Sequence, residues 1–81
     1  MKKEIYIAST AGLHAQLAAK LVDVASSFQA EVKLHYADQT VDAKSVLGLM
    51  SLAVPSGENV TVVAEGLDAE AAIFEIEKLL E

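Results

Sequence analysis

His14 is the residue best placed to carry chemistry, because it lies where a glycine-containing loop, residues 9–13, gives way to a helical pattern. A neutral imidazole is a competent nucleophile near physiological pH. The first backbone N–H groups of a helix have no partner within it, and the helix dipole adds partial positive charge there. A phosphoryl group on the ring would be held by these N–H groups, here those near Gln16 and Leu17. Gly12 would let the backbone approach the ring without a side-chain clash. The pattern predicts a phosphohistidine that forms and leaves easily; the alternative is a histidine that merely decorates a helix start.

Ser45 is the second candidate, because it occupies the N-cap position before a short apolar segment. Capping is the usual role of such a serine. Phosphorylation is the other interpretation, since phosphate is electrostatically favoured at a helix N-terminus. A short helix cannot bury all of its apolar side chains, so we expect an exposed patch that binds a partner, made by Val46, Leu47 and Met50. Alternatively, Leu49 and Met50 belong to the core and the patch is small.

The remaining inventory excludes several other chemistries. His35 alternates outward beside Lys33, with no carboxylate or second histidine at metal-ligand spacing, so we expect no metal site and no cofactor. The chain has no cysteine, which rules out disulfides and thiol catalysis. It also lacks the Gly-x-Ser-x-Gly turn of a serine hydrolase.

Composition predicts one acidic domain spanning residues 1–81. The net charge is −6 and there is no arginine, which argues against nucleic-acid binding and against anionic membrane surfaces. The longest apolar run, residues 46–54, is interrupted by Gly48 and Ser51 and is too short to cross a bilayer. The N-terminus turns at once into a strand pattern, with no signal-peptide apolar region. We therefore expect a cytoplasmic protein.

Hydrophobic periodicity predicts the elements that must position these residues. Alternation predicts strands at residues 3–8, 31–36, 40–43 and 59–65. Helical spacing predicts a helix from Ala15, a short one over residues 46–53, and a last one that begins after Asp68 as its N-cap. The apolar stripe of the last helix is predicted to be Ala69, Ala72, Ile73, Ile76 and Leu79.

The fold class that follows is α+β, in the order β-α-β-β-α-β-α. Each strand has a single apolar face, so helices should cover one side of an antiparallel sheet and leave the other in water. The pattern does not fix the strand order, because a ferredoxin-like arrangement would use the first six elements equally well.

Two segments resemble one family. Residues 11–18, Ala-Gly-Leu-His-Ala-Gln-Leu-Ala, are similar to the Gly-Leu-His-Ala-Arg-Pro-Ala signature of HPr, the histidine-containing phosphocarrier of the sugar phosphotransferase system. Residues 44–52 resemble the regulatory serine segment of that family. The resemblance covers essentially the whole chain and implies the HPr-like open-faced β-sandwich, a four-stranded antiparallel sheet with three helices on one face.

The resemblance also implies a function and partners. His14 would accept phosphoryl from Enzyme I and pass it to Enzyme IIA, as a stoichiometric carrier and not an enzyme. The family's partner surface would map onto Val46, Leu47 and Met50. The chain departs from the signature at Gln16, where the family has arginine, and at Leu17, where it has proline.

Two other functions stay open. In the first, His14 is idle and an HPr kinase/phosphorylase modifies Ser45, so that the chain binds a carbon-control transcriptional regulator, as in the catabolite-repression paralogue of HPr. In the second, the chain is a ferredoxin-like module that binds a small ligand or dimerises.

Overall fold

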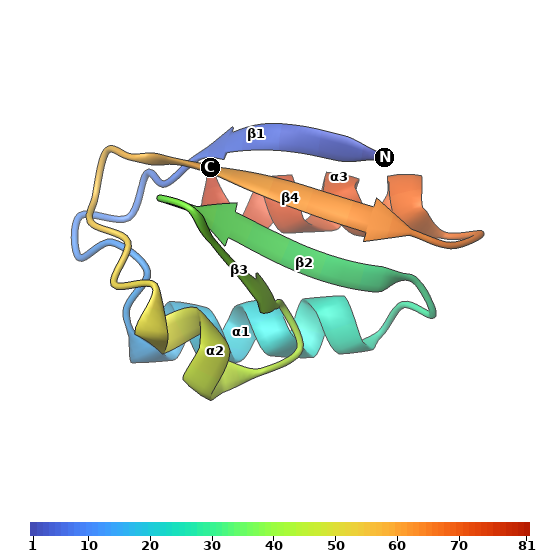
Figure 1. The fold of residues 1–81 in the computed structure, drawn as a ribbon, viewed down its shortest axis with the longest axis horizontal. Helices are drawn as coiled ribbons and strands as arrows, with labels where there is room; N and C mark the ends of the chain where they lie inside the picture. The colour runs from blue at the N-terminus through green and yellow to red at the C-terminus, as the bar shows by residue number, and fades with distance from the viewer.

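The structure, a computed structural model, describes residues 1–81 and contains seven elements in the predicted order. The strands are β1 (Lys2–Tyr6), β2 (Glu31–Tyr36), β3 (Gln39–Asp42) and β4 (Asn59–Glu65), and the helices are α1 (Ala15–Ser26), α2 (Val46–Ser51) and α3 (Ala69–Leu80). Figure 1 shows the sheet with β1 and β3 at its two edges.

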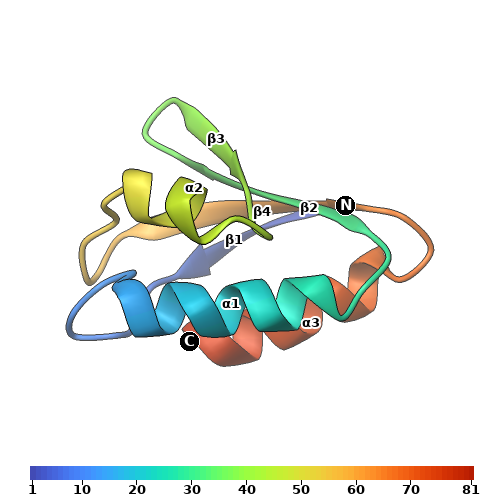
Figure 2. The same ribbon diagram turned by 90° about the horizontal axis from the view of Figure 1, so that it is seen from below.

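The four strands form one antiparallel sheet in the order β1-β4-β2-β3. α1 and α3 lie side by side on one face of it (Figure 2), and α2 packs against α1 and β3, so the sheet is an open-faced α+β sandwich, as predicted. Alternation along each strand explains this layering, because successive side chains point to opposite faces. In β4, for example, Val60, Val62 and Ala64 are buried whereas Asn59 and Glu65 are exposed.

A single apolar core fills the space between sheet and helices. It contains 22 buried hydrophobic residues and no buried charged or polar side chain. Full burial of one Leu, Ile or Val side chain contributes about 1.5–3 kcal/mol, and this term holds a domain of 81 residues together without crosslinks. The predicted stripe of α3 is buried except for Leu79, which is only partly covered, while its neighbour Leu80 is buried.

Several element boundaries differ from the predicted ones. β1 ends at Tyr6 and not at residue 8, because the N–H of Ala8 leaves the sheet and donates to the Leu80 carbonyl at 3.1 Å. α2 ends at Ser51, and Ala53 after it has φ +50°, a left-handed conformation that stops the helix. The β2–β3 hairpin turns on Ala37 and Asp38, which both have positive φ.

Asp68 is the N-cap residue of α3, as predicted, but its carboxylate makes no capping bond to the helix. The two carboxylate oxygens instead accept hydrogen bonds at 2.8 Å from the N–H groups of Gln29 and Ala30, which join α1 to β2. The N–H of Gln29 holds the pKa of Asp68 below its ordinary value, against the opposing effect of burial, with help from the N–H of Ala30 and the charge of Lys44.

The two hydrogen bonds from Gln29 and Ala30 to the Asp68 carboxylate, here called the Asp68 clamp, predict a contribution to stability that is lost in acid. We expect Asp68→Asn to lower Tm by several degrees at pH 7, because a neutral amide accepts hydrogen bonds more weakly than a carboxylate. The pKa of Asp68 is lower in the folded chain, so the contribution is complete above the ordinary aspartate value, about 3.8, and is lost as the pH falls through the folded value. Thermal melts from pH 7 to pH 2 should show the difference from wild type shrinking in acid, with Asp23→Asn as the control. A difference that stayed constant would contradict the clamp.

Candidate functional site

His14 is the N-cap residue of α1, as predicted. Its backbone is extended, with φ −84° and ψ 175°, and its carbonyl accepts the first bond of the helix from Ala18 N–H at 2.8 Å. The side chain makes no capping bond and is half-buried, so the ring is partly open to solvent. The imidazole is therefore free to meet a reactant.

The first turn of α1 presents three unpaired donors beside this ring. The backbone N–H groups of Ala15, Gln16 and Leu17 have no acceptor in the chain. No acidic side chain lies in the first turn, so nothing there offsets the positive end of the helix dipole. The Gln16 side chain is exposed, whereas the Leu17 side chain is buried in the core. Anchoring Leu17 in this way fixes the turn, and the arrangement suits an anion held on or near His14.

A close backbone contact places the loop that leads to His14. Leu13 N–H donates to the Val54 carbonyl at 2.9 Å, which joins the loop to the segment after α2. Gly12 is buried with φ +70°, and a Cβ built on it would lie 2.4 Å from the Val54 oxygen. Glycine is therefore required by contact with Val54 and Pro55, whereas the sequence suggested an approach to the imidazole. Since Gly12 N–H already donates to the Ser9 carbonyl at 3.0 Å, Gly12 shapes the loop and does not supply a free donor.

Ser45 is the N-cap of α2, as predicted. Its hydroxyl oxygen accepts from Gly48 N–H at 3.1 Å, and its carbonyl accepts from Leu49 N–H at 3.0 Å. Lys44 holds the preceding turn, since its Nζ donates to the Phe28 carbonyl at 3.1 Å. The half-buried serine hydroxyl thus has a structural role in starting α2.

An apolar surface lies on α2, at the same end of the molecule as His14. Val46 and Met50 are each 39% exposed and Leu47 is 84% exposed, while Leu49 is fully buried. The alternative that Leu49 belongs to the core therefore holds for that residue and not for Met50. α2 packs beside α1 (Figures 1 and 2), and the Leu13–Val54 bond ties the two segments at this end. The structure thus brings the histidine and the predicted partner surface together.

His35 lies apart from this site, on the open face of the sheet. It is exposed, and its Nδ1 lies 2.8 Å from Thr40 Oγ1 across the β2–β3 pair. The chain contains no group of three or more His, Cys, Asp or Glu side chains arranged to bind a metal. None of its helices is long and apolar enough to cross a membrane.

Comparison with known proteins agrees with this geometry. A family model described as the PTS HPr component phosphorylation site matches residues 1–81. The phosphocarrier protein HPr from Bacillus anthracis is 34% identical, with a TM-score of 0.96 over 100% of this chain and 96% of that one. HPr-C-His from Thermoanaerobacter tengcongensis is 39% identical, with a TM-score of 0.95 over 99% of this chain and 90% of that one.

The catabolite-repression protein Crh of Bacillus subtilis is also similar, at 36% identity and a TM-score of 0.80 over 96% of this chain and 90% of that one. Its crystal structure shows a dimer with a swapped domain. These matches extend over nearly all of each chain, and they decide for the HPr fold over the ferredoxin-like arrangement. Because the family model matches the whole chain and the solved HPr structures share its fold and sheet order, the chain belongs to the HPr family of the phosphotransferase system.

Proposed function

We propose that the chain is a phosphocarrier in which His14 accepts a phosphoryl group from Enzyme I and passes it to an Enzyme IIA domain. The observation that carries this proposal is the set of unpaired N–H groups of Ala15, Gln16 and Leu17 beside a half-open imidazole. A neutral ring nitrogen of His14 attacks phosphorus, a nitrogen–phosphorus bond forms, and the bond from phosphorus to its donor breaks. In the second step a nucleophile of Enzyme IIA attacks the phosphorus, a new bond to phosphorus forms, and the nitrogen–phosphorus bond breaks. His14 is thereby regenerated, so the chain carries phosphoryl and has no turnover of its own.

The two departures from the family signature change how the phosphoryl oxygens are held. Arginine would offer a charge-assisted hydrogen bond, about twice as strong as a neutral one, whereas Gln16 offers only a neutral amide. Proline has no N–H, whereas Leu17 supplies a third backbone donor in the first turn. The site thus relies on backbone donors and the helix dipole in place of a side-chain cation.

The partner surface proposed for both transfer steps is the apolar patch on α2. The helix that carries its exposed side chains, α2, packs against α1, whose N-cap residue is His14, so one docked partner would cover the patch and reach the ring. Exposed apolar groups of this kind favour protein partners over small ligands. Enzyme I and Enzyme IIA would therefore bind in turn, at overlapping positions.

Incubation with Enzyme I and phosphoenolpyruvate tests the proposal directly. Intact-mass spectrometry should show the addition of one phosphoryl group that is lost in acid and kept in alkali, as expected of a phosphohistidine. A protein that remains unmodified while its circular dichroism shows the native fold would refute the carrier function.

Restoring the arginine is expected to speed the transfer. We expect Gln16→Arg to raise the rate of phosphoryl uptake from Enzyme I by about fivefold, because a charge-assisted bond gains roughly 1 kcal/mol over a neutral one. Rapid-quench measurement of the uptake rate checks this. Ala19→Arg, at an exposed position one turn further along α1, is the control for added positive charge. Equal acceleration by both variants would assign the effect to net charge and not to contact with the phosphoryl group.

A second candidate function is regulation through Ser45, favoured by the likeness to Crh and by the place of this hydroxyl at the start of α2. HPr kinase/phosphorylase with ATP would then add a phosphate to Ser45, and the product would bind a carbon-control transcriptional regulator. The mark would be stable in acid, which separates it from phosphohistidine in the same mass measurement. Absence of an acid-stable phosphate on wild type, or its persistence on Ser45→Ala, would remove the basis for this function.

A further inference from the structure

The outer edge of β1 carries backbone groups that have no partner. Hydrogen bonds alternate along an antiparallel strand, so every second residue of an edge strand faces outward. The backbone N–H and C=O groups of Met1 form hydrogen bonds with Ala64 of β4. Those of Ile7 form hydrogen bonds with Glu58 and Gly57, just before β4. The N–H and C=O groups of Lys2, Glu4 and Tyr6 therefore point away from the sheet.

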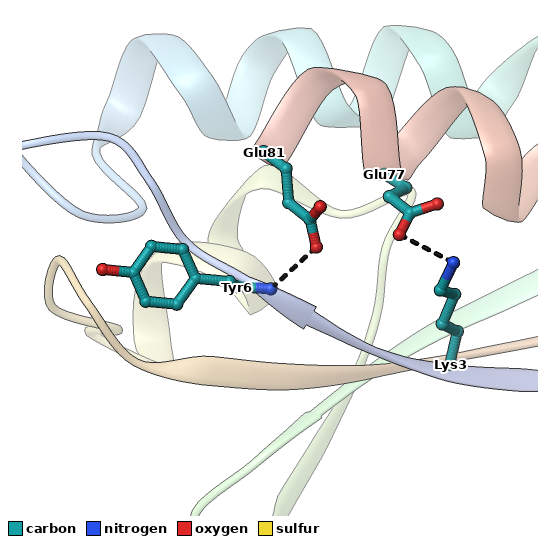
Figure 3. Close-up of polar contacts among 4 residues, drawn as sticks. All are labelled: Lys3, Tyr6, Glu77 and Glu81. Atoms are coloured by element: carbon teal, nitrogen blue, oxygen red, sulfur yellow. Dashed lines mark hydrogen bonds and ion pairs between the residues drawn. The ribbon is translucent and has the colours of Figure 1, made fainter.

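The C-terminal end of α3 covers only part of this edge (Figure 3). Glu81 Oε2 accepts from Tyr6 N–H at 3.3 Å, and the Leu80 carbonyl accepts from Ala8 N–H at 3.1 Å. The N–H and C=O groups of Lys2 and Glu4 have no such cover. An uncovered strand of residues 1–5 is left, and a free edge of this kind can pair with another strand.

The side chains on this uncovered stretch are complementary to a copy of themselves. Lys2 and Glu4 are exposed and lie on the open face of the sheet, since Lys3 and Ile5 between and after them point toward the helices. If two copies of β1 pair antiparallel about Lys3, each Lys2 lies directly opposite Glu4 of the second copy. Opposite charges at such positions stabilise a strand pair, whereas like charges would repel.

We propose that this edge is a self-association site, at which β1 strands of two copies pair antiparallel about Lys3. The backbone N–H and C=O of Lys2 then exchange hydrogen bonds with those of Glu4 of the second copy. The two-fold axis repeats the exchange, and the two sheets join into one of eight strands, four from each copy. No segment is exchanged between the copies, so each keeps its own β1.

The helix side of the same edge supports this pairing. The two Lys3 side chains meet at the axis, but each is already neutralised by Glu77, with Nζ and Oε2 2.7 Å apart (Figure 3). A groove of about 260 Å³ between β1 and α3 opens here, and its apolar lining includes Met1 and Phe74, each 58% exposed. A second strand laid along the edge covers part of this apolar lining.

The proposed contact leaves the candidate phosphoryl site open. The pairing uses the N-terminal half of β1, whereas the loop to His14 leaves from the other end of the strand (Figure 1). Paired copies would hold their two His14 sites at opposite ends. Association is therefore compatible with phosphoryl uptake by both copies.

A charge-reversal cycle tests the register. We expect sedimentation equilibrium to show a reversible dimer of the full chain at concentrations up to about 1 mM. Lys2→Glu alone, or Glu4→Lys alone, should raise the dissociation constant about tenfold or more, because each places two like-charged pairs across the axis. An equimolar mixture of the two variants should dimerise like wild type, since both cross-strand pairs are then opposite in charge. The double variant Lys2→Glu/Glu4→Lys should also recover.

Two matched variants control for net charge. Lys20→Glu and Asp23→Lys make the same charge changes at exposed positions of α1, and they should leave the dissociation constant unchanged. A wild-type chain that stays monomeric at the highest concentration overturns the proposal. So does a dimer that tolerates both single reversals, because exchange of a segment between copies would not depend on the Lys2–Glu4 register. Failure of the mixture to recover would refute the two-fold arrangement about Lys3.

Discussion

Replacing His14 with alanine is expected to abolish the acid-labile phosphoryl group while leaving the fold intact. The ring is the proposed nucleophile, and no other side chain lies at the start of α1 that could take its place. The imidazole makes no capping hydrogen bond and is only half-buried, so its removal should change the free energy of unfolding by no more than about 0.5 kcal/mol. Intact-mass spectrometry after treatment with Enzyme I and phosphoenolpyruvate measures the first effect, and thermal melting measures the second.

The other histidine provides the matched control. His35 is exposed on the open face of the sheet and contacts Thr40, away from the first turn of α1. His35→Ala should therefore take up phosphoryl as the wild type does. A chain that still gained an acid-labile group after loss of His14, or that lost it only with His35, would place the acceptor elsewhere.

The fold could be predicted from the sequence because its layers depend on simple periodicity. Alternation in residues 59–65 gives β4 one buried face, and helical spacing places Ala72, Ile73 and Ile76 against the sheet. Strand order could not be predicted in this way, because β1 and β2 have the same alternation of apolar and polar residues, and alternation does not say which strand pairs with which. It depends on pairing between distant residues, such as Ile5 with Val60 and Leu34 with Val62, and only the structure and the family resemblance supply it.

Sequence patterns could not predict a side chain that hydrogen-bonds to a segment far away in the sequence. Asp68 occupies an N-cap position, but its carboxylate binds the N–H groups of residues 38 and 39 positions away in the sequence, which propensity cannot anticipate. Ala37 and Ala53 adopt positive φ although alanine disfavours it, so residue preference alone does not mark the hairpin turn or the end of α2. The N-cap positions of His14, Ser45 and Asp68 could all be predicted, since helix starts leave a local signature, but only Ser45 makes the capping bond with its side chain.

Gly12→Ala is the second substitution for which we expect a large effect. The added Cβ would lie 2.4 Å from the Val54 oxygen and 3.0 Å from backbone atoms of Pro55, which cannot move aside as a flexible side chain could. The substitution also forces alanine into φ +70°. The left-handed backbone costs about 1–2 kcal/mol and the steric overlap about 1–3 kcal/mol more, so the free energy of unfolding should fall by roughly 2–5 kcal/mol. Urea denaturation monitored by circular dichroism measures this loss.

Gly57→Ala separates the two causes, because Gly57 has the same left-handed backbone, at φ +86°, without the overlap. The nearest atom to its added Cβ is Tyr6 Oη at 3.7 Å, an ordinary contact. This variant should lose only the backbone contribution, about 1–2 kcal/mol, and should keep its rate of phosphoryl uptake. Gly12→Ala should lose uptake as well, because a shift at Val54 breaks the Leu13 bond that places His14 at the start of α1. If both variants were destabilised equally and transferred phosphoryl equally well, the contact between the loop and Val54 would not position His14, and the order of the site would have to come from α1 alone.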